Sequence, residues 1–213
     1  MSGTIVHGVA GSPYVQAVRL ALEEKQAAYV FAAMPSGTSK EPAHLARHPF
    51  GRVPAFEHDK FALYETQAIV RYIDETFAGP SLVPSGARQR ARMNQILGLV
   101  DWYAFPSWAV KIAVQRLFVP RSGRTPDEAV IESAMPEAAT CVRELDRFRE
   151  ENGGPYLVGA APSLADFVVA PFYAYFAKTP EGKRLLEPHQ GLRGWWERMS
   201  ARDSVKKIIL APA

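Results

Sequence analysis

The spacing of apolar residues changes period within residues 49–77. Two short apolar runs, residues 55–58 and 62–64, flank turn residues at 58–60, which predicts a tight antiparallel hairpin. Beyond residue 64 the apolar positions recur at helical spacing, at Ala68, Ile69, Tyr72, Ile73 and Phe77. The hairpin is therefore predicted to lead directly into a helix. Thr66 is a good N-cap, so the free amides of the first helical turn could bind an anionic ligand.

Pro54 follows Val53 immediately before the first strand of this hairpin. Because proline has no N–H for the sheet, this position is either a strand entry or a rigid turn with a cis peptide bond. In the second case Val53 would offer its N–H and C=O to a partner instead of to the sheet. An extended peptide lying antiparallel to Val53 could use both groups.

The first part of the chain predicts a strand, a helix and a second strand. Residues 5–7 read as a strand, Ser12-Pro13 as a helix start, and residues 29–32 as the next strand. With the hairpin and its helix, this order matches a thioredoxin-like fold. Redox members of that fold carry C-P-Y-C where this chain has Ser12-Pro13-Tyr14-Val15, so exchange by a dithiol of its own is excluded. The geometry is retained with a hydroxyl in place of the first thiol.

Residues 79–86 are rich in proline, glycine and serine, which indicates a linker. Beyond them only helical spacing is found: a long helix over 87–118 with a kink near Pro106, a second over 126–151, and a third that begins with a capping box at Ser163. We therefore predict an α/β thioredoxin-like domain at 1–78, a linker at 79–86, and an all-α domain at 87–213.

Bulk composition excludes several classes of protein. Charged residues at 22% and hydrophobic residues at 47% are typical of a globular protein, and a net charge of +3 without a basic cluster argues against nucleic-acid binding. The longest apolar stretch, 167–177, is too short to cross a membrane. A single cysteine, Cys141, and a first segment unlike a secretory signal favour the cytoplasm. His44 and His48 have metal-compatible spacing, but Pro49 disfavours helix there, so no metal is expected.

Two separated motifs resemble those of soluble glutathione transferases. V-P-A-F at 53–56 followed by Y-E-T-Q-A-I at 64–69 resembles the glutathione-binding motif, with Thr66 in place of the common serine. G-x-x-x-S-L-A-D at 159–166 resembles the signature of the helical domain. T-P-D-E-A-V at 125–130 and the tryptophan pair 195–196 are similar to the phi branch. The resemblance covers nearly the whole chain.

The resemblance implies a binding site for glutathione and indicates which residues of this chain would form it. Ser12 matches the serine that donates a hydrogen bond to the glutathione thiolate in serine-type members. The glutathione-binding residues implied by the family are Lys40 and Arg52 for the glycine carboxylate, Val53 for the cysteinyl backbone, and Glu65 and Thr66 for the γ-glutamyl end. Phi members usually have a histidine shortly before this lysine, whereas residues 38–39 here are threonine and serine.

The second substrate would be a small hydrophobic electrophile bound between the two domains. Candidates for its site are Tyr14, Met34, Phe105 and Trp108, each of which also suits a plain core position. Three hypotheses remain open: a homodimeric detoxifying glutathione transferase, a glutathione-dependent peroxidase or dehalogenase using the same thiolate, and a non-catalytic binding protein on the same fold.

Overall fold

The computed structural model describes residues 3–211, which form two compact units. One unit holds the residues up to Val83 together with those from Asp203 onward, and the other holds Pro84–Arg202. The boundary near Val83 falls within the predicted linker at 79–86. The predicted fold class, a thioredoxin-like unit with a mixed sheet followed by a helical unit, is confirmed.

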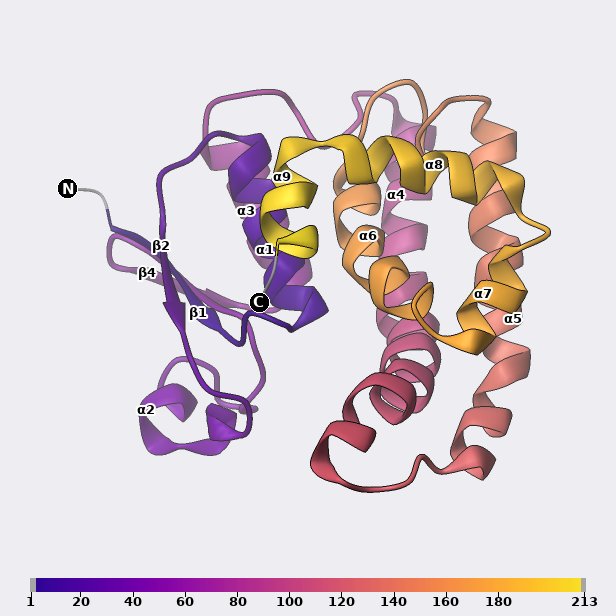
Figure 1. The fold of residues 1–213 in the computed structure, drawn as a ribbon. Helices are drawn as coiled ribbons and strands as arrows, with labels where there is room; N and C mark the ends of the chain where they lie inside the picture. Colours follow the sequence, from indigo (N-terminus) through magenta and orange to yellow (C-terminus); the bar gives the residue numbers. More distant parts are fainter. Residues whose placement is uncertain (1–2, 212–213) are drawn as a thin grey trace. The chain divides into compact units, whose positions relative to one another are not determined.

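The first unit is built on a four-stranded sheet of order β2-β1-β3-β4. β1 (Thr4–Gly8) pairs in parallel with β2 (Val30–Ala33) and antiparallel with β3 (Ala55–His58), which forms the predicted hairpin with β4 (Phe61–Tyr64). Figure 1 shows α1 (Pro13–Glu24) and α3 (Thr66–Thr76) side by side on one face of this sheet. Between β2 and β3 lie a 3₁₀ turn, Thr38–Lys40, and the short helix α2 (Pro42–Leu45). The paired strands thus fix the positions of the loops that connect them.

A buried ion pair joins α1 to α3. Lys25 Nζ lies 2.9 Å from Asp74 Oδ1, and the two side chains are only 3% and 6% exposed. Lys25 Nζ also donates to the carbonyl of Pro80 at 3.1 Å, and the N–H of Leu82 donates to Asp74 Oδ1 at 2.7 Å. A buried charge is costly unless it is paired and hydrogen-bonded, and here both charged groups are. The two additional hydrogen bonds also fix the position of the segment that follows α3.

The end of the chain packs on the first unit, not on the helical unit in which we predicted it. α9 (Asp203–Val205) and the π-helix Lys206–Leu210, drawn in yellow in Figure 1, lie against α1. Lys207 Nζ contacts Glu23 Oε2 at 2.8 Å, and Ser204 donates to Glu24. The apolar periodicity of this segment signals burial without naming the surface that covers it, which is why the predicted domain 87–213 extends too far.

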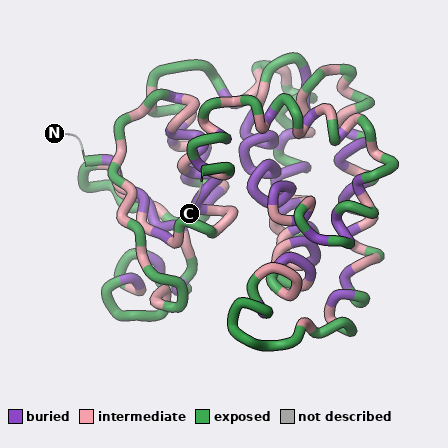
Figure 2. Tube along the Cα trace, viewed as in Figure 1, coloured by how far each residue is buried: buried purple, intermediate pink, exposed green. Residues whose placement is uncertain are grey.

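The helical unit starts with α4 (Ala87–Leu99), which continues without interruption into a π-helix, Val100–Phe118. Pro106 lies inside this wider helix, where its missing N–H removes one regular hydrogen bond. A 3₁₀ turn, Pro120–Ser122, leads to α5 (Glu128–Asn152), and α6 (Leu164–Phe176), α7 (Pro180–Leu186) and α8 (Gln190–Ala201) follow. Figure 2 shows α6 in purple along most of its length, so this helix is the centre of the unit's core.

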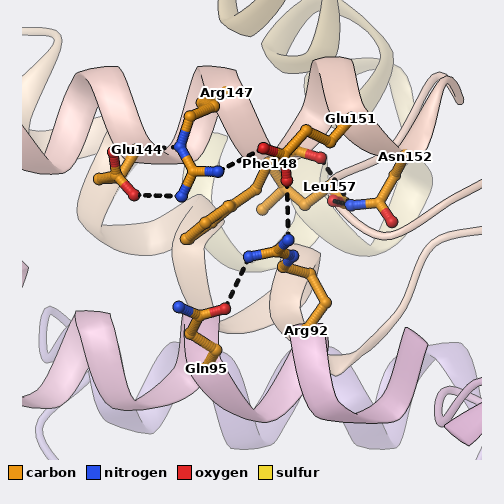
Figure 3. A network of polar contacts seen from close by, with 8 residues as sticks. All are labelled: Arg92, Gln95, Glu144, Arg147, Phe148, Glu151, Asn152 and Leu157. Atoms are coloured by element: carbon orange, nitrogen blue, oxygen red, sulfur yellow. Dashed lines mark hydrogen bonds and ion pairs between the residues drawn. The ribbon is translucent and has the colours of Figure 1, made fainter. Parts of the chain in front are cut away.

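Polar contacts between α4 and α5 enclose one aromatic ring, as Figure 3 shows. Arg92 Nη2 contacts Glu151 Oε2 at 2.7 Å across the two helices, and Arg147 contacts both Glu144 and Glu151. The guanidinium carbons of Arg92 and Arg147 lie 4.2 and 4.6 Å from the centroid of the Phe148 ring. Exposed ion pairs contribute little singly, but here they cover an apolar side chain that is 1% exposed.

The predicted capping box at the start of α6 is present and reaches further than expected. Asp166 Oδ2 accepts from the N–H and the hydroxyl of Ser163 at 2.8 and 2.9 Å. Its Oδ1 accepts from the N–H of Leu157 at 2.9 Å and from Trp195 Nε1 at 2.8 Å. Burial raises the pKa of the Asp166 carboxyl, while these four donors oppose that shift. One carboxyl therefore joins α6, the preceding loop and α8.

Candidate active site

The strand register brings several loops to one edge of the sheet. His7 pairs with Ala55, and Ala55 pairs in turn with Tyr64. Because β1 and β4 both run antiparallel to β3, the ends of β1 and β4 meet the beginning of β3 at the same edge. The loop after β1, the Val53–Pro54 turn and the junction at Glu65 are therefore neighbours, as an extended ligand would require.

Ser12 occupies the N-cap position of α1 without capping the helix. Its backbone is extended, with φ −74° and ψ 124°, and Pro13 is the first helical residue. The backbone of Ser12 is fully engaged, since its N–H donates to Val9 and its carbonyl accepts from Gln16. Its hydroxyl makes no capping bond, and it has no hydrogen-bond partner among residues 3–211. The alternative that Ser12 serves only as a helix cap is therefore not supported, and the hydroxyl is available to a ligand.

Gln16 supports the loop that carries Ser12, a role that the sequence interpretation missed. It is 5% exposed, and its Nε2 donates to the carbonyl of Ala10 at 3.2 Å. Its Oε1 is buried and has no partner in the described part of the chain. Position i+4 from the cap places Gln16 on the same helix face as Ser12, and a polar residue on an otherwise apolar face was the available signal.

The Val53–Pro54 peptide bond is cis, which decides between the two predicted readings of this proline. The ladder with β1 begins at Ala55, so Val53 lies outside the sheet. Its N–H and C=O form no hydrogen bond with another described residue. Both groups are therefore free to pair with an extended ligand at this edge.

Glu65 and Thr66 form the junction between β4 and α3, one residue out of step with the predicted cap. Glu65, not Thr66, is the N-cap, and its backbone has φ 72° and ψ 113°, which is uncommon for a residue with a side chain. Thr66 is the first helical residue and is 7% exposed. The spacing of apolar residues predicted the helix but not the residue at which it begins. Unusual backbone conformations of this kind cluster at ligand sites.

Lys40 and Arg52 lie in the segment between β2 and β3. Lys40 Nζ donates to the carbonyl of Phe50 at 2.7 Å, and its stem covers Gly51, where an added Cβ would lie 2.5 Å from Lys40 Cδ. Arg52 is exposed, and its carbonyl lies 2.7 Å from Nε2 of the buried His44. The segment thus presents two cations from a braced backbone.

His48 lies in the same segment and was not predicted to belong to the site. It is 2% exposed, and its ring centroid is 4.9 Å from that of Tyr64, immediately before Glu65. Burial lowers the pKa of His48, so the ring is neutral near pH 7. Its role here is packing beneath the β4–α3 junction. In residues 3–211 no group of three or more His, Cys, Asp or Glu side chains could hold a metal ion.

The four candidates for the electrophile site have different environments. Tyr14 and Met34, in the first unit, are half-buried, and so is Phe105, in the helical unit. Trp108 is 1% exposed, its Nε1 donates to the carbonyl of Ala138 at 3.2 Å, and its ring stacks on Phe176 at 4.5 Å. Trp108 is therefore a core residue of the helical unit, which is the second of the two roles that the sequence left open for it. Aromatic residues at helical spacing fit both roles, so sequence alone could not separate them.

Cys141 cannot supply a nucleophile. It is 2% exposed, and burial raises the pKa of its thiol to about 12. The thiolate is the reactive form of cysteine, and the Cys141 thiol stays protonated near pH 7. This residue is therefore an unreactive part of the packing of α5. Any sulfur chemistry must use a thiol from a ligand.

Comparison with known proteins identifies the family that this fold and this site define. Family models for the glutathione S-transferase N-terminal and C-terminal domains match residues 6–81 and 128–198. The chain is 31% identical over 221 residues to the probable glutathione S-transferase GSTF1 of Oryza sativa subsp. japonica, covering 100% of this chain and 99% of the relative. It is 29% identical over 215 residues to glutathione S-transferase F7 of Arabidopsis thaliana, covering 98% and 100%.

Solved structures agree with this assignment. Glutathione transferase F7 from Populus trichocarpa is similar with a TM-score of 0.85 at 27% identity, over 96% of this chain and 97% of that one. A glutathione S-transferase I bound to lactoylglutathione is similar with a TM-score of 0.85 at 25% identity, over 98% and 99%. The chain belongs to the glutathione S-transferase family. Its relatives at full length include the phi-type plant enzymes that the sequence motifs resemble.

Proposed function

We propose that this protein binds glutathione at the sheet edge and catalyses attack of its thiolate on small hydrophobic electrophiles. The observation that carries the proposal is the Ser12 hydroxyl, which stands at the start of α1 with no partner in the described chain, beside the free backbone of Val53 and the Glu65–Thr66 junction. In the reaction the sulfur forms a bond to the electrophilic carbon, and the leaving group departs with the electron pair of its own bond. The thiol proton passes to solvent.

The energetics of this step are within reach of the groups present. A free thiol has a pKa of about 8.5, and lowering it by ~2 units takes about 2.7 kcal/mol of preference for the charged form. A hydrogen bond from Ser12 to a charged sulfur supplies about 1.5–3 kcal/mol, and the N-terminus of α1 about 0.3–1 kcal/mol. Ser12 therefore acts as a donor, and no general base is needed.

The rest of glutathione is assigned to groups along the same edge. Val53 pairs through its backbone with the cysteinyl residue, and Lys40 and Arg52 hold the glycine carboxylate. Glu65 binds the γ-glutamyl ammonium, and Thr66 with the first-turn amides of α3 binds its carboxylate. The similarity to a transferase solved with lactoylglutathione supports a glutathione derivative as the ligand. Tyr14, Met34 and Phe105 remain candidates for contacts to the electrophile, in a detoxifying role in the cytoplasm.

The function is tested by glutathione binding and by turnover measured together. We expect the purified chain to be retained on immobilised glutathione and to conjugate 1-chloro-2,4-dinitrobenzene. Retention without conjugation would instead favour the non-catalytic binding protein. Faster reduction of cumene hydroperoxide than conjugation would favour the peroxidase alternative, and no retention at all would overturn the assignment of the site.

The proposal includes a homodimer, supported by an exposed apolar surface on the helical unit. Trp102 and Tyr103 are 77% and 52% exposed, and they border a hollow of about 420 Å³ between α4 and α5, with Leu99 and Phe148 among its lining residues. Large aromatic side chains at such exposure are typical of surfaces that a partner covers. A second copy of the chain is the partner that the family resemblance implies.

The homodimer predicts a mass in solution of twice the 23.5 kDa chain. Light scattering after gel filtration should report this mass for the unaltered chain. Trp102→Asp places a charge on the covered surface and should shift the mass to that of one chain. The matched change Val110→Asp, at a 44% exposed position of the same helix, tests whether a new charge anywhere on this helix is enough to separate the dimer. A single-chain mass for the unaltered protein at micromolar concentration would contradict the proposal.

The helices of residues 3–211 do not include one with the length and apolar character needed to span a membrane.

A further inference from the structure

Gln16 is a polar residue among the buried apolar residues of α1. It is 5% exposed, and the other buried residues of this helix, which include Val15, Val18 and Leu20, are apolar. Burying an amide is unfavourable unless its hydrogen bonds are restored inside the protein. Packing alone therefore favours an apolar side chain at this position, and the presence of glutamine needs another explanation.

The two polar atoms of the Gln16 amide differ in their bonding. Its Nε2 donates to the carbonyl of Ala10 at 3.2 Å. Its Oε1 is buried and has no hydrogen-bond partner among residues 3–211. Because a carbonyl can only accept, exchanging the two amide atoms would place an oxygen against the Ala10 carbonyl and lose the one bond that is made. The described chain thus provides no donor for this buried acceptor, which is uncommon in a folded protein.

The bond to Ala10 acts on the loop between β1 and α1. The first end of this loop is fixed by packing, since a Cβ added at Gly8 would lie 2.5 Å from Val15 Cγ2. Ala10, in the middle of the loop, is exposed and has no such packing. The side chain of Gln16 ties this exposed part of the loop to α1, two residues before Ser12.

This loop closes as a β-turn, in which the N–H of Ser12 donates to the carbonyl of Val9 at 3.0 Å. That bond forms equally well when the central peptide, between Ala10 and Gly11, is flipped. The flipped turn requires a positive φ at its third residue, which glycine tolerates but which Gly11 does not adopt here. The Ala10 carbonyl belongs to the central peptide, so its bond to Gln16 selects one of the two orientations.

We propose that Gln16 is a positioning residue for the transferase reaction, and that its amide holds the turn in the orientation that directs the Ser12 hydroxyl at the glutathione sulfur. This inference rests on the proposed function, in which Ser12 donates to the thiolate. A flip of the central peptide changes the backbone that leads into Ser12, and a hydrogen bond weakens steeply as its donor angle departs from linear. Gln16 acts through Ser12 and does not touch the sulfur.

Gln16→Met tests this role, because it keeps the length and burial of the side chain and removes both polar atoms. The exposed Ala10 carbonyl can bond to water instead, and the buried acceptor is gone, so the midpoint of urea unfolding should not fall. Catalysis should fall nevertheless. We expect kcat for 1-chloro-2,4-dinitrobenzene to drop at least about 5-fold in mildly acidic buffer, with KM for glutathione changed by less than about 2-fold.

Two further measurements separate this role from a structural one. The pH–rate profile of Gln16→Met should move to higher pH, because a misplaced Ser12 donor leaves the bound thiol harder to ionise. In a chain that already carries Ser12→Ala, Gln16→Met should slow turnover by less than about 2-fold more, because the residue through which it acts has lost its hydroxyl. Val18→Ala is the matched control. Val18 is fully buried in the same helix, so this change should lower the urea midpoint and leave the profile in place.

The outcomes that would overturn the inference are distinct from those that test Ser12. A lower urea midpoint for Gln16→Met with an unmoved profile would make Gln16 a packing residue. An equal loss of turnover with and without the Ser12 hydroxyl would show that Gln16 does not act through it. If Ser12→Ala slowed catalysis and Gln16→Met did not, this inference alone would fail. If Ser12→Ala had no effect, the thiolate donor and the role of Gln16 would fail together.

Discussion

Ser12→Ala is expected to lower kcat/KM for 1-chloro-2,4-dinitrobenzene by at least ~10-fold, which corresponds to about 1.4 kcal/mol of transition-state stabilisation. The hydroxyl makes no capping bond, so the substitution removes no interaction that holds α1. What it removes is the donor to the glutathione sulfur, worth about 1.5–3 kcal/mol for a charged acceptor. The loss should therefore appear in catalysis and not in folding.

The pH dependence of the same variant separates this role from a structural one. Loss of the donor raises the pKa of the bound thiol toward that of free glutathione, so the rate profile should move to higher pH and the deficit should shrink in alkaline buffer. Ser133→Ala, on the exposed face of α5, is the matched control and should leave the profile in place. An unchanged profile for Ser12→Ala would remove Ser12 as the thiolate donor.

Asp166→Ala is expected to lower the free energy of unfolding by at least about 3 kcal/mol. The carboxyl is fully buried and accepts four hydrogen bonds, from Leu157, twice from Ser163, and from Trp195. Truncation leaves these donors buried without an acceptor and opens a cavity at the start of α6. Since α6 is the centre of the helical core, the whole unit should lose stability.

Urea unfolding followed by circular dichroism measures this loss, and Asp127→Ala provides the scale. Asp127 is the N-cap of α5, where its carboxylate accepts one bond, from the N–H of Val130 at 3.2 Å, at the surface. Asp127→Ala should lower the free energy of unfolding by about 1 kcal/mol. If Asp166→Ala cost no more than Asp127→Ala, the buried network would contribute little to stability and our account of it would be wrong.

The features that the sequence predicted correctly are those with local signals. The hairpin at 55–64 follows from alternation and a turn, the start of α1 from Ser12-Pro13, and the box at Ser163 from a spacing of three residues. Each involves neighbours along the chain, so the residues themselves hold the information. Ser12, Val53 and Glu65 were grouped by the family resemblance, and the strand register places the segments that carry them at one edge of the sheet.

The features that the sequence analysis missed depend on contacts between residues that are far apart in the chain. Lys207 contacts Glu23 across 184 positions, and Lys25 contacts Asp74 across 49. Periodicity indicates that a side chain is buried but not what buries it, which is why Trp108 could be read as a substrate contact. The left-handed backbone of Glu65 was equally beyond reach, because glutamate has no preference for that conformation.

The sole cysteine of the chain has a practical consequence because of where it lies. Cys141 is 2% exposed and its thiol is held protonated near pH 7, so maleimide reagents should not modify it in the native protein. A cysteine introduced at any exposed position would then be the single reactive handle on the molecule. Fluorophores and spin labels can therefore be attached at chosen positions while the natural residue stays in place.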